Sequence, residues 1–140
     1  MKILARINNE GGRNDVSLST NENVHPIDIP AKAGGAGSKA NGGELLFLAL
    51  ATCCCNDLYR EAAARGIEVV SAEIEVGDEF GSAGEPARNI IYRARIKARG
   101  ATEQQVMELL EHTDSVAEVH NTLRKGIDVR LVGKRVEVVK

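Results

Sequence analysis

The segment from Asn41 to Asp57 constrains the fold of this chain most, because it places three consecutive cysteines inside a long apolar run. Asn41 can accept a hydrogen bond from the first free backbone donors of a helix, and Glu44 completes a capping box. Gly66 is a natural helix stop. These signals predict one helix of about 24 residues, roughly 36 Å long. Because the run is apolar almost all round as far as Cys55, we expect this helix to be buried on most sides.

The three thiols are predicted to have different environments. At 100° per residue, Cys53 falls on the polar side with Asp57, Cys55 falls on the apolar side with Leu58, and Cys54 lies between them. A thiolate is the nucleophile, and it needs a positive neighbour or polar contacts to lower its pKa. Cys53 is therefore the candidate reactive thiol, with a structural role as the alternative. Cys55 is expected to pack as a small hydrophobic residue.

Composition indicates one globular domain over residues 1–140. The chain is 43% hydrophobic and 27% charged, with no repeat or linker. Its net charge of -2, pI near 5.9 and scattered basic residues argue against nucleic-acid binding. The chain has no Trp and four other aromatic residues, which leaves no base-stacking platform.

The cellular location and the cofactors are predicted mainly from sequence patterns that are missing. The first seven residues do not resemble a signal peptide, and the apolar run of about 11 residues is too short for a membrane span. Three cysteines without framework spacing favour a reducing cytoplasm. The cysteines and scattered histidines lack zinc-site spacing, and the glycines of residues 31–40 lack the phosphate-loop pattern. We therefore expect no metal and no cofactor.

Hydrophobic periodicity and turn signals predict an α+β fold. Strands are expected at residues 2–8, 16–20, 24–29, 68–79, 88–99, 127–132 and 135–139, with a hairpin loop at residues 11–15. Capping boxes predict two further helices, one from Thr102 to about His112 and one from Ser115 to near Gly126. Antiparallel pairing of the two long strands would set their acidic and basic residues opposite each other on a solvated face.

Five segments together resemble a known family. In order they are Gly34-Gly35-Ala-Gly37, Asn41-Gly-Gly-Glu-Leu-Leu, Ala-Leu-Ala-Thr-Cys53, Ala63-Ala-Arg-Gly66-Ile and Val119-His-Asn-Thr-Leu123. The chain is similar to the OsmC and organic hydroperoxide resistance (Ohr) superfamily over nearly its whole length. The resemblance implies an OsmC-like fold, with antiparallel sheets and a long central helix. It also implies an intertwined homodimer with a thiol site at its interface.

The resemblance further implies reduction of organic hydroperoxides. In such members a peroxidatic cysteine attacks the O–O bond and becomes a sulfenic acid, which a second cysteine captures as a disulfide that an external dithiol reduces. Cys53 occupies the peroxidatic position. Arg13 resembles the arginine of the family's Gly-Gly-Arg loop, whose guanidinium holds the thiolate and polarises the peroxide. An ordinary hairpin arginine is the alternative for Arg13.

Two departures from the family pattern affect the site. Gly42 and Gly43 stand where the family has Asn-Pro, so Glu44 is either a shifted partner for Arg13 or only a capping residue, and capping is favoured. Ala117 replaces the second cysteine. Neighbouring thiols on one helix cannot replace that cysteine, because adjacent Cα atoms are about 3.8 Å apart and residues two apart point to nearly opposite sides.

Two functions follow from these residues. The first is a one-cysteine, thiol-dependent reductase of apolar organic hydroperoxides that uses Cys53, Arg13 and Glu44, an external thiol or dithiol and a pocket lined by apolar residues, among them Leu46, Ala49 and Leu50. The alternative is a non-enzymatic member that binds a small hydrophobic ligand or senses oxidants through Cys53. His120 is expected to be a polar residue near the dimer pocket, and His112 a residue at a helix C-terminus.

Overall fold

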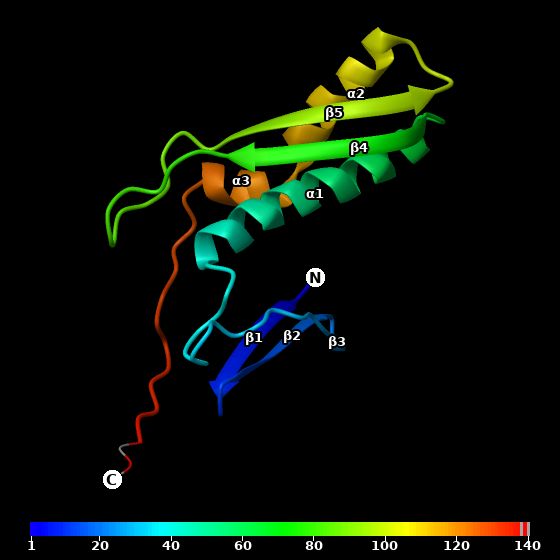
Figure 1. The fold of residues 1–140 in the computed structure, drawn as a ribbon. Coiled ribbons are helices and arrows are strands. Elements are labelled where there is room, and N and C mark those ends of the chain that lie inside the picture. Colours follow the sequence, from blue (N-terminus) through cyan, green and yellow to red (C-terminus); the bar gives the residue numbers. More distant parts are fainter. Residues whose placement is uncertain (138, 140) are drawn as a thin grey trace. The chain divides into compact units, whose positions relative to one another are not determined.

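The computed structural model describes residues 1–137 and 139 and has the predicted α+β architecture, with antiparallel sheets and three helices in these residues (Figure 1). In chain order the elements are β1 (Ile3–Glu10), β2 (Arg13–Thr20), β3 (Asn23–Pro26), α1 (Gly42–Ala64), β4 (Glu68–Gly77), β5 (Ile91–Arg99), α2 (Glu103–Val116) and α3 (Glu118–Arg124). The chain forms two compact units. The first comprises Met1–Leu48 and Phe80–Ala87, and the second comprises Ala49–Glu79 and Arg88–Lys140.

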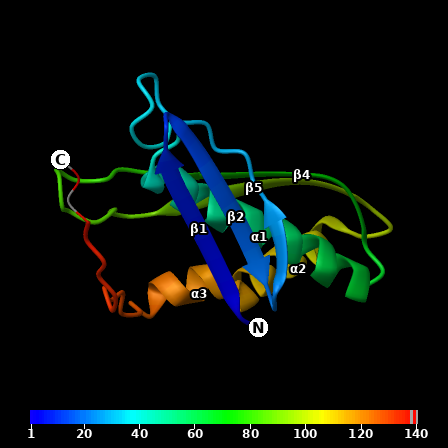
Figure 2. The same cartoon turned by 90° about the horizontal axis from the view of Figure 1, so that it is seen from below.

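The first unit contains an antiparallel sheet in the order β1-β2-β3 (Figure 2). β1 and β2 are joined at Gly11 and Gly12, both of which have positive φ, as two-residue hairpin turns require. Arg13 pairs with Glu10 as the first residue of β2. The five-residue hairpin loop predicted around Arg13 is therefore wrong, because the two glycines complete the turn.

The glycine-rich segment of residues 31–40 contacts this hairpin turn at close range. A Cβ on Gly35 would lie 2.5 Å from the Cα of Gly12, so only glycine fits there. The Asn9 amide donates to the Gly35 carbonyl at 3.0 Å, and the Asn14 amide donates to Ser38 Oγ at 2.9 Å. These contacts fix the backbone on both sides of Arg13.

The first turn of α1 is capped as predicted. Glu44 N–H donates to Asn41 Oδ1 at 2.9 Å, and Asn41 N–H donates to Glu44 Oε2 at 2.7 Å. Phe47 packs on Phe80 with ring centroids 5.5 Å apart. A Cβ on Gly43 would lie 2.8 Å from the Phe80 ring, so this glycine leaves room for the aromatic contact.

The second unit is built on the β4-β5 hairpin. Every second residue of β5 faces inward, whereas a bulge between Val69 and Ser71 interrupts this alternation on β4. Helices cover the inward face, with Leu58 of α1 and Leu109 of α2 at the centre of the core. The outer face carries the predicted charge pairs, Glu73 opposite Arg95 and Glu75 opposite Arg93. The Glu73–Arg95 pair is an ion pair of 2.7 Å between exposed side chains, of a kind that contributes about 0–1 kcal/mol.

The two later helices follow the sequence prediction only in part. The capping box of Thr102 and Gln105 is present, but α2 continues past His112 to Val116. Ser115 lies inside α2 and donates to the His112 carbonyl at 2.7 Å. The predicted Ser115 cap is therefore wrong, and α3 starts after Ala117 without a side-chain cap.

The chain after α3 does not form the predicted hairpin. Residues 127–137 and 139 contain no helix or strand, and residue 138 lies outside the described residues. The alternating apolar residues of this segment are exposed, among them Val129, Leu131 and Val136. An isolated two-stranded hairpin is only marginally stable in water. In the described residues, no other element packs against this segment to stabilise it.

Candidate functional site

Cys53 lies in the middle of α1 and is half-buried. Its thiol donates to Asp57 Oδ2, with a distance of 3.4 Å between sulfur and oxygen. The backbone N–H of Val119, in α3, donates to the sulfur. Asp57 Oδ1 accepts from Arg60 Nη1 at 2.7 Å. The thiol predicted from the helical wheel is therefore in a polar environment.

The inward face of α1 differs from the predicted one. Its buried residues are Leu50, Cys54, Asp57, Leu58 and Ala62. Cys54, which is 1% exposed, is the buried thiol, whereas Cys55 is half-buried in a shallow groove beside β4. The prediction for this side of α1 therefore holds only in part: Leu58 and Ala62, predicted to share the side of Cys55, are buried, whereas Cys55 itself is only partly covered.

Acidic neighbours give Cys53 an unusual environment. Burial raises the pKa of the Cys53 thiol, and the Asp57 hydrogen bond and the negative charges of Asp57 and Glu118 act in the same direction. The Val119 N–H opposes them. For Cys54, burial raises the pKa to about 11. Within the second unit, these groups together favour the neutral thiol of Cys53 over its thiolate.

Potential ligand atoms of Cys53, Asp57 and Glu118 lie within 4.8 Å of one another. The sequence analysis missed this cluster because Glu118 comes from α3, 65 positions along the chain from the thiol. A structural zinc site needs four ligands and uses mainly cysteine and histidine. We therefore assign these carboxylates to the electrostatic environment of the thiol.

Arg13 and Glu44, the other two predicted site residues, belong to the first unit, whereas Cys53 belongs to the second. Arg13 is exposed at the start of β2, and Glu44 closes the capping box of α1. In the described part of the chain, Arg13 and Glu44 form no ion pair with each other. The observed contact of Glu44 is the favoured capping interaction.

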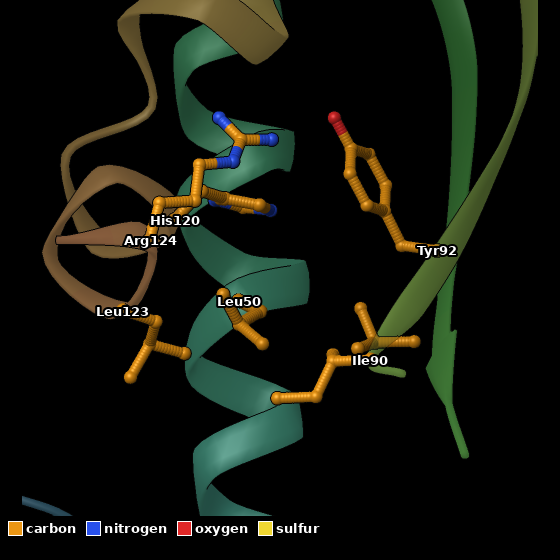
Figure 3. A pocket seen from close by; sticks show the side chains of 7 residues that line it. Leu50, Ile90, Tyr92, His120, Leu123 and Arg124 are labelled. Atoms are coloured by element: carbon orange, nitrogen blue, oxygen red, sulfur yellow. The ribbon is translucent and has the colours of Figure 1, made fainter. Parts of the chain in front are cut away.

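A second feature of this unit is a cavity of about 110 Å³ between α1, α3 and the strands β4 and β5 (Figure 3). Its lining residues are Leu50, Val76, Ile90, Tyr92, His120, Leu123 and Arg124. Leu50 is the one predicted apolar lining residue that belongs to it. His120 is buried against this cavity. His112 instead pairs with Glu61 of α1 at 2.9 Å.

The family model that matches this sequence is that of the OsmC-like proteins, over residues 35–132. The chain belongs to the OsmC-like family. The match includes the cysteine-bearing helix α1 and the α3 segment that contacts Cys53. No curated protein matches the sequence.

Solved structures confirm the OsmC-like fold. An OsmC-like protein from Mycoplasma pneumoniae is 19% identical, with a TM-score of 0.61 and coverage of 89% of this chain and 87% of the other. An organic hydroperoxide resistance protein OsmC from Legionella pneumophila is 15% identical, with a TM-score of 0.56 and coverage of 93% and 94%. One from Elizabethkingia anophelis is 20% identical, with a TM-score of 0.53 and coverage of 91% of each chain.

No described helix combines the length and the apolar character that crossing a membrane would require.

Proposed function

We propose that this OsmC-like chain is a thiol-dependent reductase of organic hydroperoxides, with Cys53 as its peroxidatic cysteine. Family membership and two structural relatives described as organic hydroperoxide resistance proteins support this proposal. The observation that carries it is the position of Cys53, half-buried in α1 with the Val119 N–H directed at its sulfur. A backbone donor stabilises negative charge on sulfur.

In the proposed reaction the Cys53 thiolate attacks one peroxide oxygen of ROOH. The S–O bond forms as the O–O bond breaks, the leaving alkoxide takes a proton to become ROH, and Cys53 becomes a sulfenic acid. Two external thiols then return the sulfenic acid to the thiol, giving their own disulfide and water. We assign Arg13 to stabilising the thiolate and the developing alkoxide, and Glu44 to holding Arg13 in addition to capping α1.

Asp57 and Glu118 make an arginine necessary in this mechanism. Both carboxylates favour the neutral thiol, so a nearby guanidinium has to offset their effect before attack is efficient at neutral pH. Ala117 is buried at the position where the family resemblance places a resolving cysteine. The sulfenic acid therefore depends on an external thiol and is exposed to irreversible oxidation when reductant is scarce.

We further propose that the active form is a homodimer of a single OsmC-like domain in a reducing compartment such as the cytoplasm. Large apolar side chains stay exposed in both units, among them Ile3 and Ile7 of β1, Leu48 and Tyr59 of α1 and Leu131 of the C-terminal segment. Extensive apolar exposure of this kind marks an interaction surface. Three unpaired thiols fit reducing conditions.

The raised pKa of Cys53 favours a second candidate function. A thiol whose neutral form is favoured reacts slowly with peroxide, which suits a non-enzymatic protein that binds a small hydrophobic ligand. In that case oxidation would be slow and stoichiometric, and added thiol would not produce turnover.

Steady-state peroxide consumption tests the proposal. Cumene hydroperoxide and hydrogen peroxide would be compared with dihydrolipoamide or dithiothreitol as reductant, using the native chain and Cys53→Ser. Cys55→Ser is the matched control, because it alters another half-buried thiol of the same helix. We expect turnover that prefers cumene hydroperoxide, disappears in Cys53→Ser and persists in Cys55→Ser. Consumption at the thiol background would refute catalysis and leave the non-enzymatic function.

A further inference from the structure

The cavity beside His120 combines an apolar wall with a polar group that lacks a partner. Leu50, Val76, Ile90 and Leu123 supply the apolar lining. His120 is only 5% exposed, and neither of its ring nitrogens has a hydrogen-bond partner among the described residues. Buried polar groups are almost always hydrogen-bonded, and an exception needs an explanation.

The other polar side chains of the cavity are already engaged. The Tyr92 hydroxyl donates to Asp114 Oδ1, and its ring meets the His120 ring edge to face at a centroid distance of 5.0 Å. Arg124 Nη2 donates to the same Asp114 oxygen at 2.6 Å, so its charge is balanced. Figure 3 shows His120 and Arg124 projecting from α3 toward the side of the cavity where Tyr92 lies.

We propose that this cavity binds a compact apolar molecule bearing a hydroxyl group, which forms a hydrogen bond with the imidazole of His120. The site does not involve Cys53, and it goes beyond the proposed peroxide reduction. An engineered apolar cavity of about 150 Å³ binds benzene. The present cavity, at about 110 Å³, accommodates a ring or short branched chain of similar size only because it is open on one side.

The protonation of His120 explains why a neutral hydroxyl group fits this cavity better than a carboxylate. Burial lowers the pKa of His120, the Arg124 charge acts in the same direction, and Asp114 and Asp57 oppose them. A neutral imidazole offers one N–H donor and one acceptor. A hydroxyl can pair with either nitrogen, whereas a carboxylate can only accept. Arg124 is held by Asp114 and gives a carboxylate little additional attraction.

A titration of the full chain with phenol, benzene, anisole and benzoate tests this inference. Phenol is expected to bind about tenfold more tightly than benzene or anisole, the gain of one hydrogen bond. In a chain labelled with ¹⁵N-histidine, phenol should shift an imidazole nitrogen signal of His120 and leave those of His112 unchanged. Equal affinities for phenol and benzene would overturn the inference, as would tighter binding of benzoate or no binding at all.

Two variants locate the effect. His120→Phe keeps an aromatic ring in the cavity but removes both nitrogens, so phenol and benzene should then bind within about twofold of each other. His112→Phe removes the other histidine of this unit and should retain the phenol preference. A phenol preference that survives in His120→Phe would refute the role of His120. If this variant does not fold, the native ligand series and the ¹⁵N signals still decide the question.

Discussion

Adjacent cysteines on one helix have different chemistry here because each points in a different direction. Cys53 meets Asp57 and the Val119 N–H, Cys54 is enclosed, and Cys55 borders a groove next to β4. The side of Cys53 could be predicted because Asp57 is four positions away on the same helix. The burial of Asp57 and the approach of Glu118 could not, since both depend on how α3 packs.

Removing the Asp57 charge should make Cys53 more reactive. Alkylation of a thiol becomes faster as pH rises through its pKa, and Asp57 raises that pKa through its hydrogen bond and its charge. Asp57→Asn keeps the side-chain shape and shifts the pH profile of alkylation to lower pH. At pH 7.5 we expect iodoacetamide to modify Cys53 about 3- to 10-fold faster, as measured by peptide mass spectrometry.

The control for this experiment is Glu73→Gln, which removes a carboxylate from the outer face of β4. It should leave the Cys53 rate unchanged. An unchanged or slower rate in Asp57→Asn would show that Asp57 does not suppress ionisation of this thiol.

Gly35 is required by backbone packing. Its φ of +83° disfavours side chains, and a Cβ would lie 2.5 Å from the backbone of Gly12. Gly35→Ala should therefore cost about 3 kcal/mol or more in the free energy of unfolding. Gly37→Ala is the matched control, since Gly37 has a φ of +81° but no heavy atom within 4 Å, and it should cost only about 1 kcal/mol. Urea denaturation curves that show equal losses would contradict this account.

At the scale of elements, sequence signals between residues close in the chain predicted helix ends better where tertiary packing did not compete with them. The capping boxes at Asn41 and Thr102 each involve residues three positions apart, and both formed. The Ser115 signal has the same spacing, but α2 continued through it because Thr113 and Ala117 are fully buried and extend the packed surface. Tertiary packing thus decided where α2 ends.

Glu61 connects α1 to α2, because it bonds to Arg60 on its own helix, to Arg65 in the turn that follows α1 and to His112 on α2. The Arg60 hydrogen bond is the largest cause of the lowered pKa of Glu61, and the Arg65 and His112 bonds add to it. A carboxyl whose pKa is lowered on folding contributes stability above its unfolded pKa. That contribution is lost as pH falls through the folded pKa.

A fall in pH should therefore lower the Tm of the native chain more than it lowers the Tm of the Glu61→Gln variant. Thermal unfolding followed by circular dichroism at pH 6 and at pH 3.5 gives the two differences in Tm. We expect Glu61→Gln to be less stable than the native chain at pH 6, and we expect this difference in Tm to be smaller at pH 3.5. Parallel losses of Tm in both proteins would show that the Glu61 contacts contribute nothing measurable.

At the scale of the whole molecule, the apolar surface left exposed argues for a second copy of the chain. Residues 127–132 alternate apolar and polar side chains as a strand would, yet they form no strand in this single chain. The sequence pattern thus predicted the tendency of this segment to form a strand, whereas strand formation also needs a neighbouring strand, which the described residues do not place beside it. Ile3 and Ile7 are four residues apart on β1. Because side chains of a strand alternate between its two faces, both lie on the same exposed face of the sheet.

The expected mass in solution is twice the chain mass of 15.0 kDa. Light scattering after size-exclusion chromatography measures it directly. Ile7→Lys should shift the population toward monomer, whereas Asn8→Lys adds the same charge on the opposite face of β1 and should not. A native protein that elutes as a monomer at all concentrations would refute the dimer.

The enclosed thiol of Cys54 also makes the stability of its surroundings measurable without the introduction of a new cysteine. Its side chain has no access to reagent while α1 stays packed on the second unit, since it is 1% exposed. Cys53 and Cys55 are partly accessible and would be consumed first by a thiol reagent. The slow appearance of a third modified thiol would then report how often this region opens, and its rate relative to a free thiol gives the free energy of opening.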